Sequence, residues 1–324
     1  MSSSRWLLLG VSLLIAALLG IAVGTITIPL PAIIDALRGG HRDDVSTLVI
    51  RSLRLPRVLL AMLVGAGLGM SGASLQGTMR NPLAEPYLLG VSGGAAVGAV
   101  VAYSMGFGAG MLPIAAFIGA VAAVIVAFFV AHAAGARGDP RVMLMAGVVV
   151  GAFANALIML ILANAEASTV RNALWWMMGS VSESTWTQVG ALAMYVALGG
   201  GILFAVAPQM DVLSLGEDAA AGLGLNVDAA IRRIFLVSAL IAAATVAAAG
   251  LVGFVGLIVP HIMRSAGLRR HRPLLVGSAL AGATLVVLSD LLGRIIRPPA
   301  ELPLGAVTAL IGVPFFLTKL RRLA

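Results

Sequence analysis

Long apolar runs, separated by short clusters of glycine, proline and charged residues, dominate the chain. Most runs are long enough to cross a hydrocarbon core about 30 Å thick, which takes about 20 apolar residues in a helix. We predict about ten membrane-spanning helices, near residues 6–24, 57–78, 87–105, 112–134, 142–164, 187–206, 229–249, 251–264, 274–293 and 303–319. Such runs are too long for the alternating strands of a barrel, so residues 1–324 are expected to form a single all-α, polytopic transmembrane bundle.

The composition places these runs in lipid. Of the 324 residues, 60% are hydrophobic and 10% are charged, and the mean hydropathy is +1.06, so a soluble globule could not bury the apolar groups. The net charge of +8 does not indicate a nucleic-acid partner, because the basic residues fall in the gaps between apolar runs. The chain has no cysteine, which excludes disulfides and thiolate metal sites.

The distribution of basic residues orients the predicted bundle. With the N- and C-termini in the cytoplasm, 13 of the 21 Lys and Arg residues lie on the cytoplasmic side, in keeping with the positive-inside rule. Five of the other eight lie in one outer segment, between Arg38 and Arg57. This segment departs from the rule and needs an explanation of its own.

Glycine clusters at residues 65–74, 90–99 and 277–284. Small residues allow helices to approach closely in lipid, so we interpret these clusters as packing surfaces rather than as ligand sites.

Two cytoplasmic loops are candidates for function. The first is MRNPLAEP (79–86), where two prolines force an irregular connection. The second, residues 208–228, is too polar to span and predicts a short surface helix. Ser214 would cap this helix, Glu217 and Asp218 would occupy its first turn, and glycines at 222 or 224 would end it. Such a helix could dock in a groove on a soluble partner, or it could be an inert surface element.

Arginines gather on the outer side in RSLRLPR (51–57) and GRIIRPPAELP (293–303). Four of them could ring one mouth of the bundle: Arg54, Arg57, Arg294 and Arg297. The planar guanidinium suits carboxylates, so the ring would fit an acidic docking surface. The alternative is that these side chains extend to lipid phosphates.

Ionisable residues are nearly missing from the apolar interior. Asp290 and Glu166 come closest, and both are expected to reach an interface. This argues against an ion-coupled secondary carrier, which remains the alternative function, because such carriers usually hold acidic or broken-helix sites at the midplane. His261 is expected to be structural, and no catalytic spacing indicates an intramembrane enzyme. A membrane scaffold or receptor without transport is a further alternative.

Several segments, in this order along the chain, closely resemble the FecCD-type permeases, the membrane subunits of importers for cobalamin, haem and iron-siderophores. They are RLPRVLLAMLVGAGLGMSGASLQGTMRNPLAEPYLLGVSGGAAVGA (54–99), LWWMMGS (174–180), LSLGEDAAAGLGL (213–225), GLVGFVGLIVPHIMR (250–264) and AELPLGAVTALIGVPFF (300–316). The resemblance implies a bacterial inner-membrane homodimer that works by alternating access. It also implies two ATP-binding subunits below the dimer and a soluble or lipid-anchored substrate-binding protein above it.

The resemblance assigns ATP and Mg to the partner ATPase, and this chain has no Gly-rich loop ending in Gly-Lys-Ser/Thr. We therefore expect no cofactor, no metal site and no enzyme activity in this chain. The transported chelate is not fixed by the sequence; the breadth of the family favours an iron chelate.

The resemblance also implies roles for individual residues. Arg54, Arg57 and Arg294 correspond to arginines that meet acidic residues of the binding protein. A coupling helix at about 213–226 would sit in a cleft of the ATPase, and its residues are Leu215, Gly216, Glu217, Asp218, Ala219, Ala220, Ala221, Gly222, Leu223, Gly224 and Leu225. The cytoplasmic gate would comprise Asn81, Leu83, Pro140 and Arg141, although some relatives carry small hydroxyl residues near Asp139 to Arg141.

Overall fold

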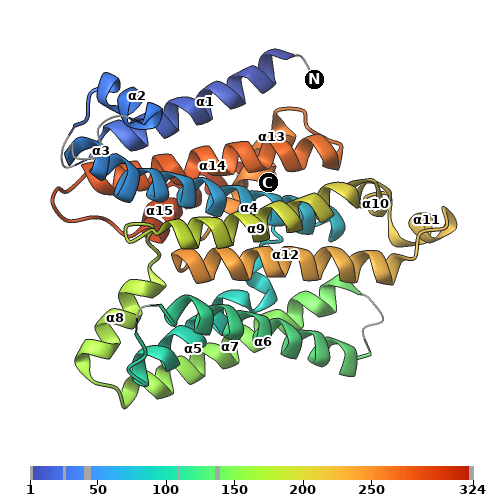
Figure 1. The fold of residues 1–324 in the computed structure, drawn as a ribbon. Coiled ribbons are helices and arrows are strands. Elements are labelled where there is room, and N and C mark those ends of the chain that lie inside the picture. The colour runs from blue at the N-terminus through green and yellow to red at the C-terminus, as the bar shows by residue number, and fades with distance from the viewer. Residues whose placement is uncertain (1–2, 25–26, 40–44, 109, 136–138, 321–324) are drawn as a thin grey trace.

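The computed structural model describes residues 3–24, 27–39, 45–108, 110–135 and 139–320, and it forms one helical bundle (Figure 1). No strand occurs among these residues. The two chain ends, which were predicted to be cytoplasmic, include residues outside the described ranges.

Seven helices are long and apolar enough to cross a membrane, within the described part of the chain. They are α1 (Ser3–Ala22), α4 (Leu55–Thr78), α6 (Leu112–Ala133), α7 (Pro140–Ala163), α9 (Trp186–Ala205), α12 (Val227–Ala249) and α14 (His271–Ile295). Each coincides with one of the ten predicted spans. The span predicted from residue 57 begins earlier, because α3 (Val45–Val49) and the π-helical η1 (Ile50–Arg54) run into α4 as one segment.

The other three predicted spans are shorter helices. They are α5 (Val91–Ser104), α13 (Val255–Ser265) and α15 (Leu304–Leu320), with 14, 11 and 17 residues. Backbone breaks shorten the first two. Gly90, which follows the 3-10 helix η2 (Pro86–Leu89), has φ +82°, and both Gly250 and Phe254 have φ +68°. A helix cannot pass through such left-handed residues.

Short helices lie at both ends of the bundle. At one end are α2 (Leu30–Arg38), α3 and α8 (Ala167–Met177), and at the opposite end are α10 (Ala207–Leu213) and α11 (Glu217–Gly222), as Figure 1 shows. We call these the α2 end and the α11 end. Of these short helices, only α11 was predicted.

Glycine lets the central helix α4 touch its neighbours backbone to backbone. A Cβ atom added at Gly65 would overlap the carbonyl group of Gly282 in α14, and one added at Gly72 would overlap the carbonyl group of Gly256 in α13. The same is true between α5 and α6, where Gly94 lies against Gly119. The glycine clusters are therefore packing surfaces, as predicted.

Candidate functional site

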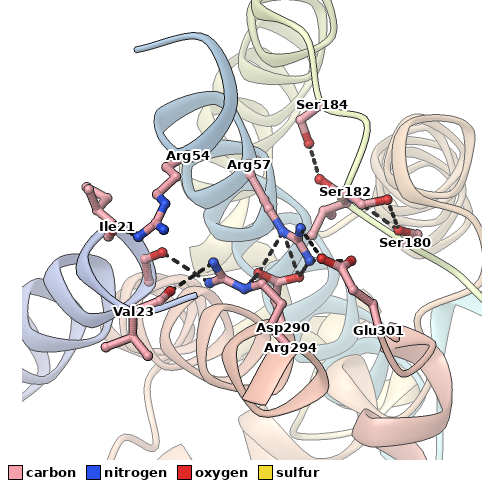
Figure 2. Close-up of polar contacts among 12 residues, drawn as sticks. Ile21, Val23, Arg54, Arg57, Ser180, Ser182, Ser184, Asp290, Arg294 and Glu301 are labelled. Carbon is pink, nitrogen blue, oxygen red and sulfur yellow. Dashed lines mark hydrogen bonds and ion pairs between the residues drawn. The ribbon is translucent and has the colours of Figure 1, made fainter. Parts of the chain in front are cut away.

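The predicted docking arginines come together at the α2 end of the bundle. Arg54 ends η1, Arg57 lies in the first turn of α4, and Arg294 lies in the last turn of α14. Figure 2 shows the side chains of Arg54 and Arg294 directed at the end of α1, while Arg57 points at two carboxylates. Arg297, the fourth member of the predicted ring, is exposed beyond the end of α14.

Arg57 is almost fully engaged by carboxylates of its own chain. Its Nη1 and Nη2 atoms each donate to one carboxylate oxygen of Glu301 at 2.8 Å. Nη2 also donates to Asp290 at 2.8 Å, and Nε donates to both oxygens of that residue at 3.1 Å. This bidentate arrangement joins α4 to α14 and to the loop that precedes α15.

Arg54 and Arg294 cap the C-terminus of α1. Arg54 donates to the carbonyl oxygen of Ile21, and Arg294 donates to those of Gly20 and Val23 at 3.1 and 3.2 Å. The last carbonyls of a helix have no partner within the helix and carry a partial negative charge, so cations stabilise this end.

Three of the four arginines of the predicted ring therefore lie in a buried ionic cluster. The side chains of Arg57 and Arg294 are 13% and 7% exposed, and Arg54 is 8% exposed. Asp290, which was expected to reach an interface, lies near the end of α14 and is packed inside the bundle. This residue is 5% exposed, and its Oδ2 atom lies 3.2 Å from Nε of Arg294. Three cations face two carboxylates, which leaves one net positive charge.

Three of the five arginines between residues 38 and 57 have partners inside the bundle. Arg54 and Arg57 are bound within the bundle, and Arg51 donates through Nε and Nη2 to the carbonyl oxygen of Ala36 at the end of α2. Charges with such internal partners need not obey a rule that concerns charges facing lipid and water.

Glu301 is the most exposed member of the cluster, at 40%. The hydrogen bonds that it accepts from Arg57 hold the pKa of its carboxyl below the usual value. It is thus the carboxylate that an incoming acidic group could most easily replace.

At the α11 end, the predicted coupling helix is shorter than residues 215–225. Glu217 and Asp218 occupy its first turn as predicted, but the predicted cap at Ser214 was wrong. The Ser214 hydroxyl donates instead to the carbonyl oxygen of Asp211 at 2.6 Å, at the end of α10. Gly216, with φ +116°, precedes α11 and sharply turns the chain between the two helices.

A cleft of about 790 Å³ brings the predicted coupling and gate segments together. Its lining comes from the end of α4, the start of α7 and the start of α11, and comprises Thr78, Met79, Arg80, Asp139, Pro140, Arg141, Leu215, Gly216, Glu217, Asp218 and Ala219. Asn81 and Leu83 follow just outside this lining. The Asn81 side chain accepts a hydrogen bond from the Leu83 amide at 2.9 Å, which fixes the turn, and Leu83 is half exposed.

A histidine–carboxylate contact that the sequence did not reveal ties this end to the core. The Asp211 carboxylate, in α10, lies 2.7 Å from Nδ1 of His271 and accepts the backbone N–H of the same residue at 2.9 Å. His271 begins α14, so α10 and the adjoining α11 are anchored to a central helix. In the sequence, this contact is represented only by two polar residues 60 positions apart, which no local pattern connects.

The broken segment 250–254 is tied to the proline-rich loop. Glu85 accepts a hydrogen bond from the Phe254 amide at 3.0 Å, and the hydroxyl of Tyr87 accepts one from the Val252 amide at 3.1 Å. His261, further along α13, packs edge-on against Phe315 with the ring centres 6.2 Å apart. These contacts give the loop and His261 structural roles.

The sequence pattern of the FecCD transport family matches residues 12–322. This chain belongs to the FecCD transport family. It is 40% identical over 280 residues to the cobalamin import system permease protein BtuC of Halobacterium salinarum. This alignment covers 86% of this chain and 74% of that protein. It is also 37% identical over 310 residues to the Fe(3+) dicitrate transport system permease protein FecD of Escherichia coli, with 95% of each chain covered.

A solved structure has the same fold. It is assigned to a metal-chelate type ABC transporter in an inward-facing conformation, and it aligns with a TM-score of 0.90 and 29% identity over 99% of this chain and 100% of that one. Together with the seven apolar helices, these relatives make the chain a multi-pass membrane protein of a permease family. The relatives are transport permeases, not enzymes.

Proposed function

We propose that this chain is the membrane-spanning permease of an ATP-driven importer that moves a metal chelate across the bacterial inner membrane by alternating access. The observation that carries this proposal is the cleft at the α11 end, where α11 meets the starts and ends of spans from distant parts of the chain. Membership of the FecCD family and the names of its relatives support a chelate such as ferric citrate, haem or cobalamin.

In this proposal the chain crosses the membrane ten times, and both termini and the α11 end face the cytoplasm. The seven long helices, with α5, α13 and α15, supply the crossings. Two copies enclose the path, two ATP-binding subunits sit below them, and ATP and Mg bind only to those subunits.

Residues 215–225 act as the coupling element. Leu215 and Leu223 flank α11 and are 64% and 68% exposed, so they offer apolar contacts to a groove in the ATPase. Ala220 between them is buried, and the Asp211–His271 pair anchors the preceding helix to α14. A push on α11 would therefore be transmitted to the core instead of being absorbed by a loop.

The cytoplasmic gate is formed by two segments beside the same cleft. Asn81 and Leu83 lie on the loop after α4, and Pro140 and Arg141 begin α7, where Asp139 caps the helix by accepting the Arg141 amide at 2.8 Å. Because both segments adjoin α11, closure of the ATPases could move them together.

The arginine cluster receives the binding protein at the α2 end. Acidic groups of that protein would compete with Glu301 for Arg57, and with the α1 carbonyls for Arg54 and Arg294. Docking would thus loosen contacts that hold α1 and the loop before α15.

A substitution in α11 tests the coupling role. Gly222→Pro is expected to break the last turn of this helix and to uncouple ATP hydrolysis from uptake in vesicles, while leaving the spans folded. Gly222→Ala is the matched control, because no atom lies within 4 Å of an added methyl group. If Gly222→Pro transported substrate with wild-type ATP consumption, residues 215–225 would not be the coupling element.

A further inference from the structure

Helix α2 presents three different surfaces around its circumference. Ile33 and Ala36 are completely buried against the bundle. Leu30, Ile34 and Leu37 are 53%, 39% and 57% exposed, and at about 100° per residue they fall within about 60° of one another, beside the buried pair. Two charged residues, Asp35 and Arg38, occupy the sector beyond them and are also exposed. A helix at a junction of protein, lipid and water needs this order of surfaces.

The position of α2 relative to α1 indicates how deep α2 would lie in a bilayer. The apolar part of α1, Ser4–Ala22, has 19 residues and is about 29 Å long, close to the thickness of the hydrocarbon core. The Ile28 amide donates to the carbonyl oxygen of Ala22 at 2.9 Å, so Ile28 lies directly beside the end of α1. Helix α2 begins two residues later and lies beside that end in Figure 1. It therefore starts at the level where hydrocarbon gives way to headgroups.

The exposed apolar sector of α2 adjoins other exposed apolar side chains on α1 and α3. Helix α1 is a peripheral span, and its own outward side chains include Leu8 and Leu14, 70% and 59% exposed. Val45 and Leu48 of α3, which packs against α2, are 73% and 60% exposed. The apolar surface thus continues from α1 onto the short helices at this end.

We propose that α2 lies in the headgroup region of the bilayer, with the side chains of Leu30, Ile34 and Leu37 inserted among the upper acyl chains. Arg38, in the last turn, would then be placed to meet lipid phosphates. The partner of this surface is a lipid bilayer, not another protein. The proposal does not depend on the transported substrate or on the ATPase.

A position of α2 in the bilayer surface would also affect the arginine cluster. Arg51 of η1 donates two hydrogen bonds to the carbonyl oxygen of Ala36, from Nε at 2.9 Å and from Nη2 at 2.6 Å. Arg54 ends the same π-helix. An α2 seated in the bilayer surface therefore holds η1, and with it Arg54, at a fixed height above the hydrocarbon core.

The absence of native cysteine makes a direct test possible. Single cysteines are introduced by Leu30→Cys, Ile34→Cys and Leu37→Cys, with Asp35→Cys as the matched control on the polar sector of the same helix. Each full-length variant is labelled with an environment-sensitive fluorophore and reconstituted in nanodiscs of phosphatidylcholine and phosphatidylglycerol. Quenching is measured with iodide in the water and with phosphatidylcholine brominated near the headgroup end of its acyl chains. Leu8→Cys on α1 serves as the lipid-exposed reference.

Labels at the three apolar positions should show blue-shifted emission, strong loss of intensity with the brominated lipid and weak loss with iodide, because interfacial helices bury their apolar face about 5–10 Å into the boundary region. The label at position 35 should show the opposite preference. Equal iodide quenching at all four positions would overturn the proposal. Shielding of the apolar positions from both quenchers would also overturn it, since it would mean that a second copy or another protein covers this surface.

Discussion

The contact between α4 and α14 at Gly65 allows a quantitative test of the bundle. A methyl group at this position would lie more than 1 Å inside the 3.4 Å limit of ordinary contact with the carbonyl oxygen of Gly282. The methyl group is fixed to one helix and the carbonyl group belongs to the other, so no side-chain rotation can relieve the overlap. The helices would have to separate, and overpacking of this kind costs about 1–3 kcal/mol.

Alanine gains about 1 kcal/mol over glycine in helix propensity, so Gly65→Ala should have a net cost of up to about 2 kcal/mol. For a chain of 324 residues, this corresponds to a fall in the apparent Tm in detergent of up to about 3 °C. The same separation would lengthen the 2.8 Å contact between Arg57 and Asp290, which joins the same two helices. Loss of stability should therefore be accompanied by loosening of the arginine cluster.

Gly10→Ala is the control for propensity alone, because a methyl group at Gly10 in α1 meets no atom within 4 Å. This variant should be as stable as the parent or slightly more stable. If Gly65→Ala were equally stable, α4 and α14 would not touch through their backbones, and the packing described for the centre of the bundle would be incorrect.

Three further results are expected from the cluster. The Glu301 carboxyl has a lowered pKa, and because this side chain is 40% exposed its pairing contributes about 1 kcal/mol or less to stability. That contribution is present above about pH 4.5 and is lost as the pH falls through the lowered pKa. A Tm difference between wild type and Glu301→Gln that persisted in stronger acid would contradict this. Asp290→Asn removes the carboxylate that pairs with buried Arg294 and leaves Arg57 with Glu301 alone. It should cost about 3–5 kcal/mol in denaturation experiments, whereas a neutral effect would mean that the pair with Arg57 is not formed. Arg54→Glu combined with Arg294→Glu should weaken affinity for the binding protein in a salt-dependent manner, and unchanged affinity would remove the cluster from docking.

Hydropathy was sufficient to locate the long helices, because a helix such as α6 or α12 is an unbroken apolar run. It failed at α13. The predicted span of 251–264 begins late because Phe254 adopts φ +68°, a conformation stabilised by the distant Glu85 and not signalled by the local sequence. Helix α2 was missed because nine residues between a proline and a glycine are too few for a span, and its role depends on contact with the rest of the bundle.

At the candidate sites, too, the local sequence did not reveal contacts between distant residues. Motif resemblance identified Arg57, but its carboxylate partners lie 233 and 244 residues away, so their pairing depends on how α4 and α14 pack. The cap predicted at Ser214 failed because the preceding helix α10 uses this hydroxyl at its own end. Short-range patterns therefore indicated which segments matter, and the tertiary contacts determined what each side chain does.

The central claim, that this chain forms a transport path powered by a partner ATPase, is tested most directly by uptake into sealed vesicles. The chain would be reconstituted with its ATP-binding subunit and binding protein and supplied in turn with labelled ferric citrate, haem and cobalamin. We expect one of these chelates to accumulate only when ATP and both partners are present, and to do so after ion gradients have been dissipated. Accumulation by this chain alone, driven by a proton or sodium gradient, would contradict the account.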